Sequence, residues 1–482
     1  SLGRPKLKNI AERFQVYALL PEPPKGLRQT LQIQRLKLSR RVGTAHRVVA
    51  AGLVLIAATV VAVRYLSRPP LSTQDSALRT AAAPAALPLP DKPSIVVLPF
   101  DNMSGDPQQD YFSNGITEVL TSDLSRISSL FVIARNTAFT YKGKAANIQE
   151  VGKELGVRYA LEGSVQRTSE QVRIVAQLIE TASGGHLWSE RYDRPLKDIF
   201  ALQDEIVQKI VTTLKLQLTL WEQGSLVRKR TDNVEAYDYF LQGVEFSYRL
   251  TKETNTQARR MFEKAIELDP QYANAYVTLG MTYFFDWFLQ WDRDPQNLPR
   301  AFDLARKAIA LDDSLPSAHR VLGLLHLFQY RHTQAIAEVE RAIALDPNFA
   351  DAYWTRGDIS ILMGQLEEAI KSIKKAIRLN PRSSTFYLNS LGAAYSELGW
   401  QEEAITTLKK AIARNPNYLI AHLNLVLAYS RAGQEEEARA EAAEVLRLNP
   451  NFSLETLSQT IPQKDPAVLK RDLEAWRKAG LK

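Results

Sequence analysis

The amino-acid sequence predicts a multidomain protein with one transmembrane helix, an α+β domain and then an all-α superhelix of repeats. Three observations predict this fold class: an uncharged apolar run near the start, a middle region that mixes strand-type alternation with helical spacing, and a small-residue pattern that recurs in the C-terminal half. The 482 residues, 45% hydrophobic and 24% charged, have the composition of a globular protein. At about 100–200 residues per domain, the chain has room for two to four domains.

Charge and cysteine content exclude several classes of function. The sequence contains no cysteine, which excludes disulfides, cysteine-ligated metal sites and cysteine nucleophiles. A net charge of +8 would suggest a nucleic-acid partner if the charge were spread over a domain. However, residues 1–47 hold eleven Lys and Arg against only Glu12 and Glu22, so the rest of the chain has a balance of −1. We therefore expect no nucleic-acid partner.

The apolar run covers residues 48–63, VVAAGLVLIAATVVAV, between Arg47 and Arg64. Sixteen residues at about 1.5 Å each span roughly 24 Å, somewhat less than a bilayer core of about 30 Å, so we extend the predicted transmembrane helix to 47–66. A buried core helix and a secretory signal peptide are the alternatives. The first fits poorly because the run is apolar on all sides, and the second because its charged leader would be too long.

The charge step across this helix predicts its orientation. Lys and Arg gather before it, which places the N-terminus in the cytoplasm and residues 67–482 on the opposite side of the membrane. Residues 67–92 contain five prolines and many alanines, and they are predicted to form an extended linker.

Residues 93–220 are predicted to form the α+β domain. Strands are expected at 93–100 and 130–135, and then three consecutive strands joined by short turns. Helical spacing of apolar residues predicts helices between and after them. The consecutive strands are expected at 157–167, 171–180 and 186–193, and the helices at 112–127, 147–156 and 197–219.

Residues 233–450 contain a pattern of small, large and small residues followed by Pro or Asp, and it occurs six times. The last positions of successive matches are separated by 43, 34, 34, 35 and 34 residues. A period of 34 with this skeleton is that of the tetratricopeptide repeat, a pair of antiparallel helices. The matches are Ala258–Phe262–Ala265–Pro270, Ala301–Ala305–Ala308–Asp313, Ala335–Val339–Ala342–Pro347, Ala369–Ile373–Ala376–Pro381, Ala404–Leu408–Ala411–Pro416 and Ala438–Ala442–Val445–Pro450.

Repeats one and two carry extra residues, which we expect in the turn between their two helices. In repeat two the addition falls in 282–294, a stretch rich in aromatic residues. It could be a partner-binding patch, but we favour packing against repeat one or the preceding domain. Residues 451–482 are predicted to form a capping helix.

The sequence shows no catalytic constellation, so we assign no catalytic residue, no metal site and no cofactor to this chain. His319, His326 and His332 cluster in repeat three, and the first two lie seven residues apart on one helix face. A metal pair is imaginable there, but both residues fall at positions where large side chains fill the seam between helices. We therefore predict structural histidines.

Two stretches resemble known families. VVLPF (96–100), ALEGSV (160–165) and LWSERYDR (187–194) resemble the TolB amino-terminal-like domain found beside repeat arrays in bacterial membrane signalling proteins, and AYDYFLQG (236–243) fits the same family. This resemblance implies a binding or assembly module.

Residues 1–20 resemble the end of the catalytic domain of class III adenylate/guanylate cyclases, with residues 21–46 as a basic cytoplasmic linker. The alternative is an unstructured basic leader. The metal-binding aspartates of that family would lie upstream of Ser1, so the resemblance assigns no cyclase site here. The matching residues are Leu2, Gly3, Leu7, Lys8, Asn9, Ile10, Val16 and Tyr17.

The resemblances imply the membrane-anchored, extracytoplasmic sensing and protein-interaction module of a bacterial adenylate-cyclase-type signalling protein. It would span the inner membrane once, with its C-terminal domains in the periplasm. The alternative is a non-enzymatic repeat scaffold or a ToxR/CadC-like transcriptional regulator, and residues upstream of Ser1 would discriminate the two. A homodimer is left open by the sequence.

A protein or peptide partner is expected in the groove of the repeats. By resemblance to the family, positions two, five, nine, twelve and thirteen of each repeat face this groove. They combine aromatic anchors with charges of both signs, as an extended peptide requires, although the same residues could merely solvate an unused groove. The candidate residues are Asn274, Phe284, Phe285, Arg320, Asp351, Trp354, Asp358 and Asn389.

Overall fold

The computed structural model describes residues 87–482 except 145, 227–230, 293, 383–384 and 460. The predicted cyclase-like tail, basic linker and transmembrane helix, and most of the 67–92 linker, lie outside the described residues and remain predictions. Within the described ranges, no helix combines the length and the apolar character that crossing a bilayer requires.

An α+β region comes first, and its strands form a six-stranded sheet in the order β3-β1-β4-β5-β6, with β2 paired to β4. Strand β1 is parallel to both of its neighbours, whereas β4, β5 and β6 form an antiparallel meander. The strands are β1 (Ser94–Val97), β2 (Asp101–Asn102), β3 (Phe131–Val132), β4 (Tyr159–Arg167), β5 (Gln171–Glu180) and β6 (His186–Pro195).

Strand β1 is buried on both faces, which explains its continuous apolar sequence. Ile95 and Val97 belong to a core with α4 (Asp110–Ser125) and α7 (Ile199–Thr213). On the opposite face, Val96 and Leu98 pack with residues of α5 (Arg135–Ala138) and α6 (Ile148–Leu155). The outer strands bury one face only, as their alternating sequence predicts.

Several predicted elements of this region are shorter in the structure. Of the expected strand at 93–100, only Ser94–Val97 forms β1. The expected strand at 130–135 ends at Val132, because the Ala134 N–H donates to the Leu379 carbonyl of the repeats (2.9 Å) and α5 begins at Arg135. The expected helix at 197–219 ends at Thr213, and a separate helix α8 (Leu220–Leu226) follows. A contact with the repeats, outside the local sequence, therefore decides where strand β3 ends.

Helices α9 to α20 form six antiparallel pairs, each with a first helix A and a second helix B. The recurring spacing of small residues in these repeats has a direct packing reason. At Gly357 an added Cβ would lie 2.4 Å from Ile373 of the paired helix, and Ala369 opposite it is fully buried. The A helices are α9 (Val234–Ser247), α11 (Ala273–Phe288), α13 (Pro316–Phe328), α15 (Ala350–Leu362), α17 (Thr385–Leu398) and α19 (Leu419–Arg431). The B helices are α10 (Lys252–Leu268), α12 (Asn297–Leu311), α14 (His332–Leu345), α16 (Leu366–Leu379), α18 (Gln401–Arg414) and α20 (Glu435–Leu448).

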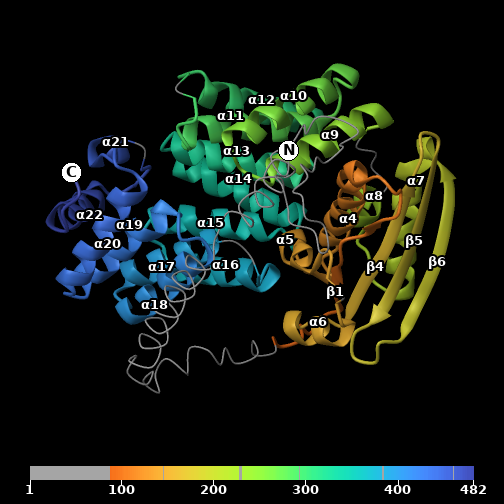
Figure 1. The fold of residues 1–482 in the computed structure, drawn as a ribbon, viewed down its shortest axis with the longest axis horizontal. Helices are drawn as coiled ribbons and strands as arrows, with labels where there is room; N and C mark the ends of the chain where they lie inside the picture. Colours follow the sequence, from red (N-terminus) through yellow and green to blue (C-terminus); the bar gives the residue numbers. More distant parts are fainter. Residues whose placement is uncertain (1–86, 145, 227–230, 293, 383–384, 460) are drawn as a thin grey trace, which may run out of the picture. The chain divides into compact units, whose positions relative to one another are not determined.

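The chain ends in two helices, α21 (Leu454–Ser458) and α22 (Pro466–Lys478), where the sequence predicted one capping helix. The repeats and the α+β region belong to one compact unit (Figure 1). Helix α4 packs closely on α9, since a Cβ at Gly115 would lie 2.5 Å from a methyl carbon of Leu241.

A second contact joins the α+β region to the loop between repeats three and four. The Ser125 hydroxyl donates to Asp346 (2.6 Å), and the Asn348 side-chain amide donates to the carbonyls of Ser125 (2.7 Å) and Leu130 (3.0 Å). Because Asp346 and Asn348 are buried, these bonds form in a site shielded from water, where an unmade hydrogen bond is costly.

Candidate functional site

The A helices form one continuous face, here called the inner face. Each A helix contacts the next A helix along the array, whereas successive B helices make fewer contacts with one another. The array therefore curves with the A helices inside. All eight candidate residues from the sequence lie on A helices, in α11, α13, α15 and α17.

The aromatic residues of repeat two are largely used for packing. Phe284 is buried at the centre of a cluster with Phe285, Phe288 and Phe328, whose ring centroids lie 5.4–5.9 Å from its own. Phe328 belongs to repeat three. Phe284 is therefore not accessible to a partner, and Phe285 is half-buried beside it.

The aromatic residues of 282–294 pack only in part against repeat one, where the sequence analysis expected them. Tyr283 does pack against repeat one, with the Arg259 guanidinium 4.0 Å above its ring. The phenylalanines instead face repeat three, because α11 continues to Phe288 and carries them past the end of repeat one. Asn274 lies half-buried near the start of the same helix.

Arg320 lies half-buried on α13, and its guanidinium carbon lies 5.7 Å from the Phe349 ring centroid. Its Nε is buried and has no hydrogen-bond partner among the residues that the structure describes. At the other end of the candidate set, Asn389 of α17 is buried and accepts a hydrogen bond from the Asn424 amide (2.9 Å). Asn389 therefore joins two repeats rather than facing a partner.

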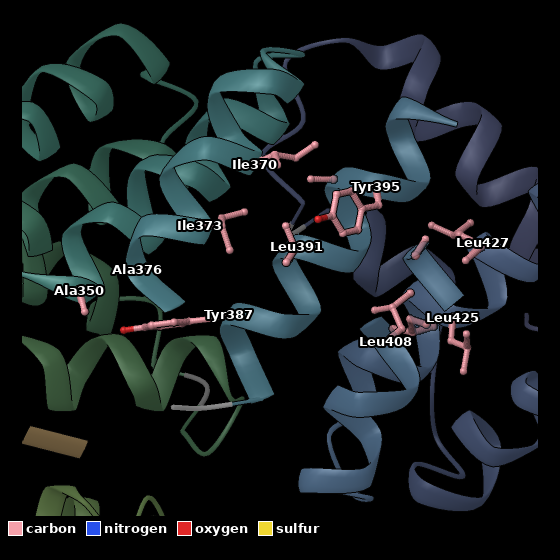
Figure 2. Close-up of a cluster of buried hydrophobic side chains, with 14 of the residues drawn as sticks. Ala350, Ile370, Ile373, Ala376, Tyr387, Leu391, Tyr395, Leu408, Leu425 and Leu427 are labelled. Atoms are coloured by element: carbon pink, nitrogen blue, oxygen red, sulfur yellow. The ribbon is translucent and has the colours of Figure 1, made fainter. Parts of the chain in front are cut away.

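Repeats four and five present the remaining candidates together. The Trp354 indole stacks near Phe386 and Tyr387, with centroid distances of 5.9 and 5.5 Å, and its N–H donates to Ser390 (2.9 Å). Tyr387 donates its hydroxyl to Asp351. Figure 2 shows Tyr387 pointing from α17 toward Ala350, below Ile373 and Leu391 of the apolar packing between α16 and α17.

Asp358 lies one turn beyond Trp354 on α15. Burial raises the pKa of its carboxyl to about 7, and a hydrogen bond from Ser390 partly opposes this shift. Ser390 therefore lies beside both the Trp354 indole and the Asp358 carboxyl.

Four contributors to this site were not among the sequence candidates: Tyr387 and Ser390, which contact Trp354, and Phe386 and Tyr418. Phe386 occupies position two of repeat five, so the register that identified Asp351 in repeat four could also have identified it. Tyr418 packs edge-on against Phe386 (4.9 Å) but precedes α19, in a loop for which the repeat pattern carries no signal.

The C-terminal region crosses the ends of the A helices. This C-terminal strap consists of α21, residues 461–465 and α22. Its α21 shares a surface hollow with Trp287 of repeat two, through Thr456. Three backbone groups of residues 461–464 then bond to repeats three and four: Ile461 to Tyr330, Pro462 to His332 and Lys464 to Leu362.

Helix α22 continues the strap across repeats five and six. Arg431 pairs with both Glu397 and Asp472 (2.6 Å to the latter), and Arg471 pairs with Glu397 (2.8 Å). The Trp476 indole donates to the Leu423 carbonyl (2.9 Å) in α19. The strap thus follows the turns between helices A and B, repeat by repeat, along one border of the inner face.

The histidines of repeat three have structural contacts. His319 lies 2.7 Å from the Glu338 carboxylate and 2.8 Å from the Asp313 carbonyl, and His332 bonds to the strap. His326 is packed edge-on against Phe302, and burial lowers its pKa.

Comparison with known proteins identifies the repeats. Tetratricopeptide-repeat family models match residues 350–383 and 402–457. The chain carries tetratricopeptide repeats. Among solved structures, the tetratricopeptide-repeat protein YrrB, described as having an unusual peptide-binding site, is 20% identical with a TM-score of 0.29 and covers 40% of this chain and 93% of its own. A MamA structure is 28% identical with a TM-score of 0.27, covering 36% of this chain and 94% of its own.

A curated relative from Rhizobium meliloti (strain 1021), named "Putative adenylate cyclase 3", is 48% identical over 237 residues. The match covers 49% of this chain and 40% of the relative, so this tetratricopeptide-repeat chain matches less than half the length of that protein.

Proposed function

We propose that this chain is the partner-binding module of a bacterial membrane-anchored adenylate-cyclase-type signalling protein, and that its repeats bind a protein or peptide segment outside the cytoplasm. The observation that carries the binding role is the Trp354 site. Its indole packs against Phe386 and Tyr387 and donates a hydrogen bond to Ser390, and yet it remains half-buried and reachable from solvent. A large aromatic ring held in place before binding loses little entropy on association.

The link to cyclic-nucleotide signalling is supported by the 48% identity to the relative described above and by the resemblance of residues 1–20 to the end of a cyclase domain. The membrane anchor and the periplasmic location are supported by the apolar run at 48–63 and the charge step before it. We assign the chain no catalytic residue and no cofactor of its own.

The binding role is tested by comparing partners captured by the full chain and by Trp354→Ala, quantified by mass spectrometry. An aromatic anchor is expected to contribute about 2 kcal/mol or more, which is roughly a 30-fold loss of affinity. Trp400→Ala is the matched control, because Trp400 is exposed in a turn outside the inner face. Equal capture by wild type and Trp354→Ala would contradict the binding role.

The location is tested separately by fusing alkaline phosphatase after residue 90 in a Gram-negative host. High phosphatase activity is expected, since the fused enzyme would lie in the periplasm. Low activity, together with an active cytoplasmic reporter at the same position, would contradict the proposed topology.

A further inference from the structure

Two carboxylates and a row of aromatic rings meet on the inner face of repeats four and five. Asp351 and Asp358 lie on either side of Trp354 along α15, and all three are half-buried. The aromatic row runs from Trp354 to Phe386 and on to Tyr418, with centroid distances of 5.9 and 4.9 Å. The site therefore offers flat apolar ring faces with a carboxylate on either side of Trp354 along α15.

Neither carboxylate has a cationic partner in the part of the chain that the structure describes. Neighbouring acidic residues do: Glu340 pairs with Arg356, and Glu397 pairs with Arg431. Asp351 instead accepts a hydrogen bond from the neutral Tyr387 hydroxyl, and Asp358 one from Ser390.

Arg320 is the one cation among the candidate residues, and its guanidinium lies over the Phe349 ring. Its charge acts on Tyr387 but forms no ion pair with Asp351 among the described residues. Neither carboxylate of this site is therefore held in an ion pair within the described chain.

An unpaired, partly desolvated carboxylate is unfavourable, and an incoming cation removes that cost. The raised pKa of Asp358 reflects the same cost, since burial raises it and the bond from Ser390 opposes the shift. An anionic ligand would meet two like charges here, and a purely apolar one would leave Asp358 without a partner. Charge complementarity therefore selects a cation.

The geometry also selects which cation. A guanidinium is planar, stacks on an aromatic face and pairs with a carboxylate through two N–H donors, whereas an ammonium acts as a point charge with a strong hydration shell. Trp354 and Asp358 supply a ring face and a carboxylate one helical turn apart, and both lie beside Ser390.

We propose that the inner face of repeats four and five binds an arginine side chain of an extended partner segment, with its guanidinium stacked on Trp354 and paired with Asp358. This rests on the proposed binding role of the inner face and specifies the chemistry of its ligand. Asp351 attracts the same basic segment from the other side of the ring.

The test is a selection of random twelve-residue peptides on the immobilised full chain in detergent, followed by fluorescence-anisotropy titration of a selected peptide. Arginine is expected to be enriched at one position. Replacing that arginine by citrulline, which keeps the shape and removes the charge, should weaken binding at least tenfold. Asp358→Asn should cause a similar loss, and in that variant citrulline should have little further effect.

Glu367→Gln is the matched control, because Glu367 is exposed on helix B of the same repeat and should leave affinity unchanged. The melting temperature of Asp358→Asn is measured first, so that a binding loss is read only from folded protein. The proposal is overturned if selected peptides depend on Trp354 but bind equally well with citrulline, and the inner face then remains a peptide site of other chemistry. If no selected peptide depends on Trp354, both this proposal and the binding role fail.

Discussion

Repeats two and four both place aromatic residues on the inner face, but they use them differently. In repeat two, Phe284 is buried because Phe328 of the next repeat closes over it. In repeat four, Trp354 rests on Phe386 and Tyr387 but stays half-buried, with its N–H bonded to a serine. Aromatic content therefore does not identify a binding surface by itself. What matters is whether the following repeat buries the ring or packs against it and leaves part of it exposed.

The largest expected effect is the difference in stability between removing the buried ring of Phe284 and removing the half-buried ring of Trp354. Phe284→Ala should destabilise the protein by about 3–5 kcal/mol, because it opens a cavity in a packed cluster. Trp354→Ala should shift the melting temperature far less, since its ring is half-exposed. Thermal unfolding of the full chain in detergent, followed by circular dichroism, measures both, and Phe288→Ala serves as a control at an exposed ring of the same cluster. Similar losses for Phe284→Ala and Trp354→Ala would remove the distinction drawn here.

The next largest effect is expected at Asp346. Its carboxyl is buried against the α+β region, whereas Asp358 is half-buried. Burial raises the pKa of Asp346 to about 6, while bonds from Ser125 and the Asn348 N–H and the charge of Arg126 oppose the shift and Asp123 adds to it. The folded state then holds a proton that the unfolded state releases near pH 3.8. Stability should therefore fall as pH rises from about 4 to 6, by up to about 3 kcal/mol.

Asp346→Asn should remove this pH dependence, because an amide does not titrate. The effect is measured from urea midpoints of wild type and variant at pH 4.5 and pH 7. The change in midpoint between the two pH values is compared for the two proteins. A wild-type stability that rises over this interval relative to the variant would show that Asp346 is ionised and paired in the folded protein.

A smaller effect is expected at His422 in repeat six. One ring nitrogen faces the Glu441 carboxylate and the other lies 2.9 Å from the Pro416 carbonyl, so the protonated ring satisfies both acceptors. The bond to Glu441 raises the pKa of His422 above 6.5. Its stabilisation, about 1–2 kcal/mol, is complete below pH 6.5 and is lost as pH rises through the folded pKa.

His422→Gln should therefore cost more stability at pH 6 than at pH 8.5, which chemical denaturation at both pH values measures. His319 of repeat three has the same pair of acceptors, Glu338 and the Asp313 carbonyl, so His319→Gln is the matched comparison. A cost that does not change with pH would show that His422 is neutral in the folded state.

The smallest effect is expected in the C-terminal strap. Arg471 is half-exposed where it pairs with Glu397, so Arg471→Gln should change the unfolding free energy by less than about 1 kcal/mol. Arg431→Gln should cost more, because Arg431 is largely buried between Glu397 and Asp472. Limited proteolysis of the strap reports whether either change releases it; equal cleavage of the two variants would contradict this order.

Local sequence predicted much of the architecture. The alternation in 171–180 coincides with β5, and the recurring alanines and glycines place six helix pairs, because close helix crossing tolerates only small side chains at these points. The same register located Trp354 and Asp358 on the face where they lie. These features follow from chain periodicity, which depends only on neighbours in sequence.

The tertiary structure alone decided which of those residues remain accessible. Phe284 and Asn389 satisfy the same register as Trp354, but Phe328 covers the first and Asn424 bonds to the second. The path of the strap along the repeats, and the closure of the α+β region over Asp346, join segments more than a hundred residues apart. Periodicity within one repeat carries no information on such distant partners, because burial depends on which surfaces meet once the whole chain has folded.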